Sequence, residues 1–116
     1  FKEATNVTLG NLVGSGPQAE IQIDDAASVS HIVQSTVKMR YYVKANAAYY
    51  QRWSGTVPLE ALHVSENQLK VRLEKLKLDP KYLAAGVKVL AEVWVERRLG
   101  NKHYTKQFKK YFTIGS

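Results

Sequence analysis

The sequence contains no cysteine among its 116 residues. This absence excludes disulfide bridges, cysteine zinc sites and thiol chemistry. It fits a cytosolic protein and a bacterial envelope protein equally well, and it argues against a small secreted animal domain, where disulfides are common. With 45% hydrophobic residues, the chain can bury a core without covalent staples. We therefore expect residues 1–116 to form a single domain.

Long apolar runs are absent as well. No stretch approaches the roughly 20 apolar residues that a membrane-spanning helix needs, and no segment has the pattern of a signal peptide. The first residue is Phe1 rather than methionine. We therefore expect the chain to be the soluble part of a longer protein, separated from any upstream signal peptide or anchor.

Catalytic and metal-binding motifs are also missing. The three histidines lie far apart in the sequence, without acid clusters beside them, which is typical of surface residues rather than ligands or bases. Glu92 and Glu96 would lie about 13 Å apart along a strand, which is long for acid–base work on one bond. Cross-strand pairing with solvated arginine or lysine is expected for them instead. We expect no enzyme activity, no metal and no cofactor.

Strict alternation is present, most clearly in the closing segment, residues 86–116. The valines of residues 87–95 share one parity, while charged residues share the other together with Leu90 and Trp94. Successive strand residues point to opposite faces, so the pattern predicts a half-buried strand. Residues 99–102 supply a turn. A second strand follows, with Phe108, Phe112 and Ile114 directed inward.

Two lysines of this second strand do not fit the pattern. Lys106 and Lys110 share the inward parity with the phenylalanines. Either a bulge shifts the register, or these lysines lie at the strand ends or along an open edge, where inward lysines discourage aggregation.

Shorter alternating segments predict the remaining strands, at residues 7–13, 19–23, 32–45, 48–57, 62–64 and 69–73. Gly55 is expected to mark a bulge. Strands at this spacing favour a mainly β fold, an antiparallel β-sandwich of seven or eight strands with immunoglobulin-like architecture. The alternatives are a small OB-like barrel, or an α+β domain with a short helix near residues 25–35 or 65–78.

Charge is concentrated at the C-terminal end. Residues 97–116 contain six basic residues and no acid, so they carry +6 of the net +7. A second basic stretch is interleaved with aromatic residues in the predicted 32–45 and 48–57 hairpin, where one outer face is expected to hold Arg40, Tyr42, Tyr50 and Arg52. Trp94 has outward parity and is expected to be exposed unless a second layer covers it. The candidate binding surface therefore consists of Arg97, Arg98, Lys102, Lys106, Lys109, Lys110, Arg40, Tyr42, Tyr50, Arg52 and Trp94.

These features support a ranked set of hypotheses about function. The first is a non-enzymatic protein-interaction or assembly module in the bacterial periplasm or cell envelope, part of a secretion, pilus or surface assembly. It would bind a partner protein or its own copies, and its basic face would suit an acidic protein or anionic lipid. The alternative is a single-stranded nucleic-acid binding domain, cytoplasmic in setting, in which arginine and aromatic side chains hold phosphates and stack bases. A third hypothesis is a small-molecule or carbohydrate binder with Trp53 or Trp94 as its platform.

Overall fold

The computed structural model describes residues 7–9, 12–15, 20–23, 35–65, 68–99 and 101–115. These residues form nine strands, and short 3-10 turns connect some of them. The strands are β1 (Val7–Leu9), β2 (Leu12–Ser15), β3 (Glu20–Ile23), β4 (Ser35–Ala45), β5 (Ala48–Thr56), β6 (Leu62–Ser65), β7 (Gln68–Arg72), β8 (Lys88–Leu99) and β9 (Lys102–Thr113). The 3-10 turns are η2 (Leu59–Ala61), η3 (Leu73–Lys75) and η4 (Pro80–Leu83).

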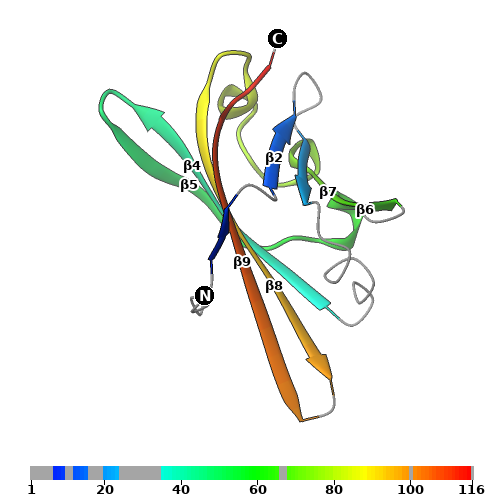
Figure 1. The fold of residues 1–116 in the computed structure, drawn as a ribbon. Coiled ribbons are helices and arrows are strands. Elements are labelled where there is room, and N and C mark those ends of the chain that lie inside the picture. Colours follow the sequence, from blue (N-terminus) through cyan, green and yellow to red (C-terminus); the bar gives the residue numbers. More distant parts are fainter. Residues whose placement is uncertain are drawn as a thin grey trace.

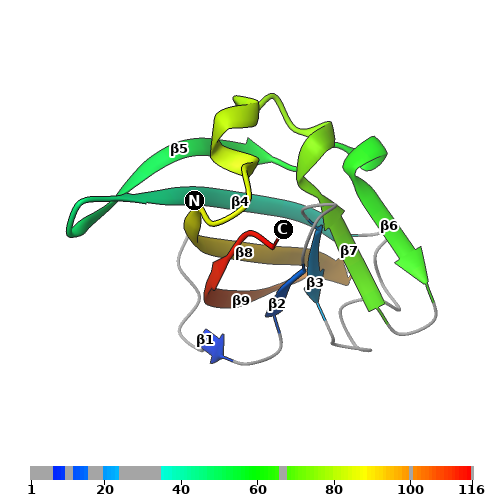
Figure 2. The ribbon, with the colours of Figure 1, turned by 90° about the horizontal axis from the view of Figure 1, so that it is seen from above.

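The strands form two sheets that pack as a sandwich (Figures 1 and 2). The large sheet has the order β1-β9-β8-β4-β5 and the small sheet the order β2-β3-β7-β6. Neighbours are antiparallel, except that β1 runs parallel to β9. Taken in chain order, β2 to β9 occupy the places of strands A, B, C, C′, D, E, F and G of an immunoglobulin-like sandwich. The predicted architecture is therefore confirmed.

The strand count differs slightly from the expectation. Nine strands are seen rather than seven or eight, because the predicted strand at residues 7–13 is two strands that belong to different sheets. The helix considered for residues 65–78 is wrong: β6 and β7 form a hairpin there, followed by η3. The helix considered for residues 25–35 falls almost entirely outside the described residues. Within the described ranges, no helix is long and apolar enough to cross a membrane.

The core lies between the inner faces of the two sheets. The small sheet contributes Ile21, Leu69 and Val71, all fully buried, and the large sheet contributes the valines of β8 and Phe108 of β9. These residues come from the alternating positions of each strand, so the period of two in the sequence becomes one apolar face per sheet. Burial of each such side chain contributes about 1.5–3 kcal/mol before entropy is counted.

Tyr41 is the polar exception inside this core. It is fully buried at the middle of β4, and its hydroxyl donates a 2.8 Å hydrogen bond to the backbone carbonyl of Tyr82 in η4. Burial raises the pKa of the Tyr41 hydroxyl well above its usual range, because the apolar surroundings disfavour the phenolate. The hydrogen bond fixes the connection between β7 and β8 against the large sheet.

The β4–β5 hairpin depends on two special backbone positions. Its turn consists of Asn46 and Ala47, and Asn46 has a φ of 61°, a conformation that asparagine tolerates better than most residues. Gly55 has a φ of 151°, which side-chain-bearing residues rarely adopt. The bulge predicted at Gly55 lies elsewhere, however. Tyr41 pairs with Trp53 and Tyr42 with Gln51, so the extra residue of β5 is Arg52.

The closing hairpin has an unbroken register. β8 and β9 pair from Lys88 opposite Thr113 to Leu99 opposite Lys102, and the tip reaches beyond the small sheet (Figure 1). A bulge therefore does not explain the inward lysines. Lys106 lies opposite Val95 and Lys110 opposite Ala91, so both have core parity.

β1 covers the edge of β9 only at residues 107–109, so Lys106 and Lys110 lie on either side of the covered stretch. Both lysines are half-buried. A lysine in such a position covers apolar surface with its aliphatic stem while its ammonium group reaches the rim of the sandwich. The Lys106 ammonium also lies 5.7 Å from the ring centroid of Phe108.

Candidate functional site

The residues predicted to form one binding surface are divided among three places. Arg97, Arg98 and Lys102 lie at the tip of the β8–β9 hairpin, and their side chains are outside the described part of the chain. Arg40, Tyr42, Trp94 and Lys109 lie on the outer face of the large sheet. Tyr50, Arg52, Lys106 and Lys110 lie on its inner side. The described side chains of the candidate binding surface therefore lie on both faces of the large sheet.

Trp94 is buried rather than exposed, although its parity is outward as expected. Its exposed fraction is 0%, and the guanidinium carbon of Arg40 lies 5.1 Å from its ring centroid. A guanidinium over an indole face is attracted by the ring quadrupole, and it shields the ring from water. Trp94 therefore cannot serve as an open platform for a ligand.

The basic residues on the outer face are matched by acids. In the strand register Glu92 lies opposite Arg40 on one side and Lys109 on the other, and the Lys38 ammonium lies 3.3 Å from the Glu96 carboxylate. The expected cross-strand pairing is confirmed for Glu96. Opposite charges on neighbouring strands offset one another, so this part of the face has little net positive charge.

Glu92 departs from the solvated state that was expected for it. Its exposed fraction is only 8%, and its carboxylate accepts a 3.5 Å hydrogen bond from the side-chain amide of Gln107. Burial raises the pKa of the neighbouring Tyr42 hydroxyl, and the carboxylate of Glu92 raises it further by accepting its proton in a hydrogen bond. The centre of the outer face thus holds two buried polar side chains, Glu92 and Gln107, that bind each other.

The bulge at Arg52 changes the faces of the β5 residues. Beyond the bulge Tyr50 lies opposite Val43, a core-facing residue, so Tyr50 is on the inner side. The Arg52 guanidinium carbon is 5.6 Å from the ring centroid of Tyr50 and 5.4 Å from that of Tyr82. Arg52 therefore belongs to the inner side together with these rings. The expected outer face of Arg40, Tyr42, Tyr50 and Arg52 is wrong, because one extra residue reverses the parity.

β5 forms one end of the large sheet among the described strands (Figure 2). Most of its nine residues are exposed, and Tyr50 is 49% exposed. An edge strand presents unpaired backbone N–H and C=O groups, which proteins usually protect with lysine, proline, inward charges or bulges. β5 contains no lysine, acid or proline, and its bulge interrupts only one position. The stretch from Trp53 to Thr56 keeps a regular register.

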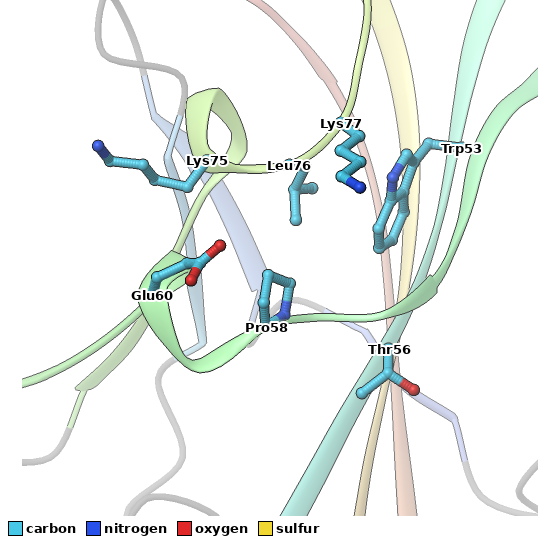
Figure 3. Close-up of a pocket in the computed structure, with 7 residues that line it drawn as sticks. All are labelled: Trp53, Thr56, Pro58, Glu60, Lys75, Leu76 and Lys77. Carbon is cyan, nitrogen blue, oxygen red and sulfur yellow. The ribbon is translucent and has the colours of Figure 1, made fainter.

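A pocket adjoins this regular stretch, and we call it the edge pocket (Figure 3). Its volume is about 240 Å³. Figure 3 shows Lys77 beside the Trp53 ring on one side, Glu60 and Lys75 on the other, and Leu76 between them. The edge pocket is lined by Trp53, Thr56, Pro58, Glu60, Lys75, Leu76 and Lys77.

Local structure explains how these residues meet. The backbone N–H of Val57 donates a 2.7 Å hydrogen bond to the carbonyl of Val37, and Pro58 then directs the chain from the large sheet toward the small one. η3 brings residues 75–77 back to the same edge, with Leu76 buried beneath. Gly55 adjoins the indole: a Cβ there would make ordinary van der Waals contact, 3.7 Å from two carbons of the Trp53 ring, so the glycine is favoured by its φ and not by lack of space.

An aromatic pair lies on the outer face near the end of the large sheet. The rings of Tyr49 and Tyr111 meet edge to face, with centroids 5.2 Å apart. Lys44 lies directly opposite Tyr49 in the β4–β5 register, and exposed Lys88 lies two residues from Leu90, the partner of Tyr111. This end of the outer face therefore combines two tyrosines with two exposed lysines.

Other chemistry is sparse in the described ranges. They hold no group of three or more histidine or acidic side chains that could bind a metal ion. Comparisons with protein-family models, with curated proteins and with solved structures find no match for this chain.

The sequence analysis missed most of the edge pocket. Of the lining residues, the sequence pointed only to Trp53, as a candidate ligand platform. One signal in the sequence could have indicated a pocket here: Trp53, Gly55 and Pro58 lie close together at the uncharged C-terminal end of a predicted strand. The contribution of Lys75, Leu76 and Lys77 depends on the crossing between sheets, which no local pattern encodes.

Proposed function

We propose that this chain is a non-enzymatic protein-interaction module that binds a partner protein along the open edge of β5. The observation that supports the proposal is a nine-residue edge strand that is largely exposed and carries a single charged residue, Arg52. Such an edge can accept another strand through main-chain hydrogen bonds, while side-chain pockets beside it supply specificity.

The proposed setting is an assembly in the bacterial envelope, in a secretion, pilus or surface structure. This part of the proposal rests on the β-rich sequence and on the lack of catalytic motifs in it, and the absence of cysteine is compatible with this setting. Fractionation of the native cells with an antibody against the chain tests it. Recovery with the cytoplasmic proteins would exclude the envelope setting without affecting the binding edge.

Site-specific photo-crosslinking in native extract tests the binding edge itself. A photoreactive phenylalanine analogue replaces Gln51, which is exposed on β5, and in a control protein it replaces Thr113, which is exposed on β9. We expect the Gln51 protein to form a covalent adduct with a partner and the Thr113 protein to form none. Absence of an adduct at Gln51 in the full-length protein would refute the proposed function.

Single-stranded nucleic-acid binding is a second candidate, and the aromatic pair favours it. Tyr49 and Tyr111 with Lys44 and Lys88 have the composition of a base-stacking surface with phosphate contacts. By contrast, Lys106 and Lys110 lie on the opposite face from Lys109, so these three do not form one patch. We expect any oligonucleotide binding to weaken steeply with salt and to depend on Lys44 and Lys88. An oligonucleotide that fails to bind at low salt would eliminate this candidate.

A further inference from the structure

The first question about the β5 edge is whether a second copy of this chain could occupy it. Arg52 is the middle residue of β5 (Ala48–Thr56). A symmetric antiparallel pairing of two β5 strands in full register would place Arg52 opposite the same residue of the copy. Like charges directly opposite one another destabilise a strand pair, and each chain carries a net charge of +7. Arg52 therefore disfavours self-pairing and favours a partner strand with a carboxylate near this position.

The second question is what the edge pocket can hold. Its volume of about 240 Å³ lies below the range of roughly 300–1,000 Å³ typical of drug-sized ligand sites. Its walls include the apolar surfaces of Trp53, Pro58 and Leu76. This size and lining suit one large apolar side chain of a protein partner better than a complete small molecule.

The position of the pocket relates it to strand addition. Trp53 and Gly55 lie on the inner side of β5, two residues apart, and Thr56 at the strand end also lines the pocket. A strand added beside β5 would lie about 4.8 Å away, and its side chains would alternate with the same two-residue period. One inward side chain of that strand would therefore fall next to the Trp53 ring, at the mouth of the edge pocket.

The charges around the pocket define the rest of the partner. Lys75 and Lys77 are exposed at its rim, and Glu60 is the one acid among the lining residues. With Arg52 on the adjoining strand, three basic residues face one acid, which leaves +2. Acidic residues on either side of the inserted apolar side chain would complement this charge.

We propose that the β5 edge binds an extended acidic segment of another protein, an inference that rests on the interaction function proposed above. The segment adds as a strand next to residues 53–56 and inserts one large apolar side chain into the edge pocket. Its carboxylates lie near Arg52, Lys75 and Lys77. Main-chain pairing supplies the geometry, and the pocket and the basic rim select the segment.

Selection from a random decapeptide display library tests this proposal. The library is applied to the wild-type chain after depletion on a Lys75→Glu/Lys77→Glu variant. We expect enriched peptides to contain an aromatic or long aliphatic residue flanked by aspartate or glutamate. A synthetic peptide of the enriched sequence should bind the Trp53→Ala variant and the Lys75→Glu/Lys77→Glu variant at least tenfold more weakly than it binds the wild type.

The matched control is Lys44→Glu/Lys88→Glu, which makes the same charge change at two exposed lysines on the outer face. It should bind the peptide within about twofold of wild type. Because Trp53→Ala could disturb packing, the Lys75→Glu/Lys77→Glu variant tests the same binding site through two exposed side chains. Amide exchange of the wild type with bound peptide should show new protection in β5.

Three outcomes would overturn the inference: enrichment of peptides without acidic residues, equal loss of binding in the control variant, or new protection only outside β5. A concentration-dependent dimer crosslinked between β5 strands would overturn it in favour of a second copy. If the Gln51 adduct forms in extract but the selected peptides are not acidic, the interaction function stands and only the acidic partner fails.

Discussion

Replacement of Tyr41 by phenylalanine removes one hydroxyl from the middle of the core and leaves the ring in place. The lost group donates the 2.8 Å hydrogen bond to the carbonyl of Tyr82. A typical intramolecular hydrogen bond contributes about 0.5–1.5 kcal/mol, and a carbonyl left without its donor adds to the cost. We expect Tyr41→Phe to lower the free energy of unfolding by about 1.5 kcal/mol near pH 8.

The same hydroxyl makes this difference depend on pH. In the unfolded chain Tyr41 ionises with a pKa near 10.0, whereas burial raises its pKa in the folded protein. Above pH 10 the unfolded state therefore loses this proton first, and the stability of the wild type falls as the pH rises. The slope approaches about 1.4 kcal/mol per pH unit for one proton. The wild type should thus lose its advantage over Tyr41→Phe near pH 11, by this arithmetic.

Urea unfolding followed by far-ultraviolet circular dichroism measures both proteins at pH 8, 10 and 11. The two proteins share every other ionisable group, so the difference between the two unfolding free energies isolates Tyr41. Tyr50→Phe is the matched control, because Tyr50 is half-exposed and the substitution keeps its ring against Arg52. A wild-type advantage that stays constant from pH 8 to pH 11 would refute the reasoning.

Two further predictions concern the large sheet. Trp94→Ala should lower the free energy of unfolding by about 3–5 kcal/mol, as for other fully buried aromatic residues; a loss below 1 kcal/mol in urea unfolding would contradict the burial of its ring beneath Arg40. Gly55→Ala should cost about 1–3 kcal/mol, because its φ of 151° is strained for alanine. Thermal unfolding followed by circular dichroism should give a lower midpoint for Trp94→Ala than for Gly55→Ala. An unchanged midpoint for Gly55→Ala would show that the backbone at residue 55 shifts to accommodate alanine without strain.

The architecture could be predicted because each strand carries its own local signal. In β8 the valines and Ala91 alternate with charged residues, Leu90 and Trp94, and the register keeps that parity over the whole strand. The inward parity of Lys106 and Lys110 was also visible in the sequence. What the sequence could not supply was the neighbour of β9, since β1 is about a hundred positions away along the chain.

The faces of β5 illustrate a different limit. Tyrosine and tryptophan occupy both parities in this strand, so its pattern does not reveal where an extra residue enters. Gly55 was the natural candidate for the bulge, yet the register is regular there although its φ is 151°. A shift of one residue at Arg52 reversed the predicted face of Tyr50.

Trp94 shows why parity alone does not establish exposure. The outward direction was correct, but the cover over the ring includes a cation from the neighbouring strand. The edge pocket was also invisible to local patterns, because residues 53–60 and 75–77 meet only after the chain has crossed between the sheets. Sites assembled from distant segments leave no periodic trace in the sequence.

The parallel pairing of β1 with β9 has a mechanical consequence. These are the first and last strands of the described chain, and they lie side by side from Val7 opposite Gln107 to Leu9 opposite Lys109. Tension applied before β1 and after β9 would pull the two parallel strands past each other along their length. Their hydrogen bonds would then be loaded together in shear instead of opening one after another. Under tension applied at its two ends, the β1–β9 pair would therefore be the part of the domain that resists stretching.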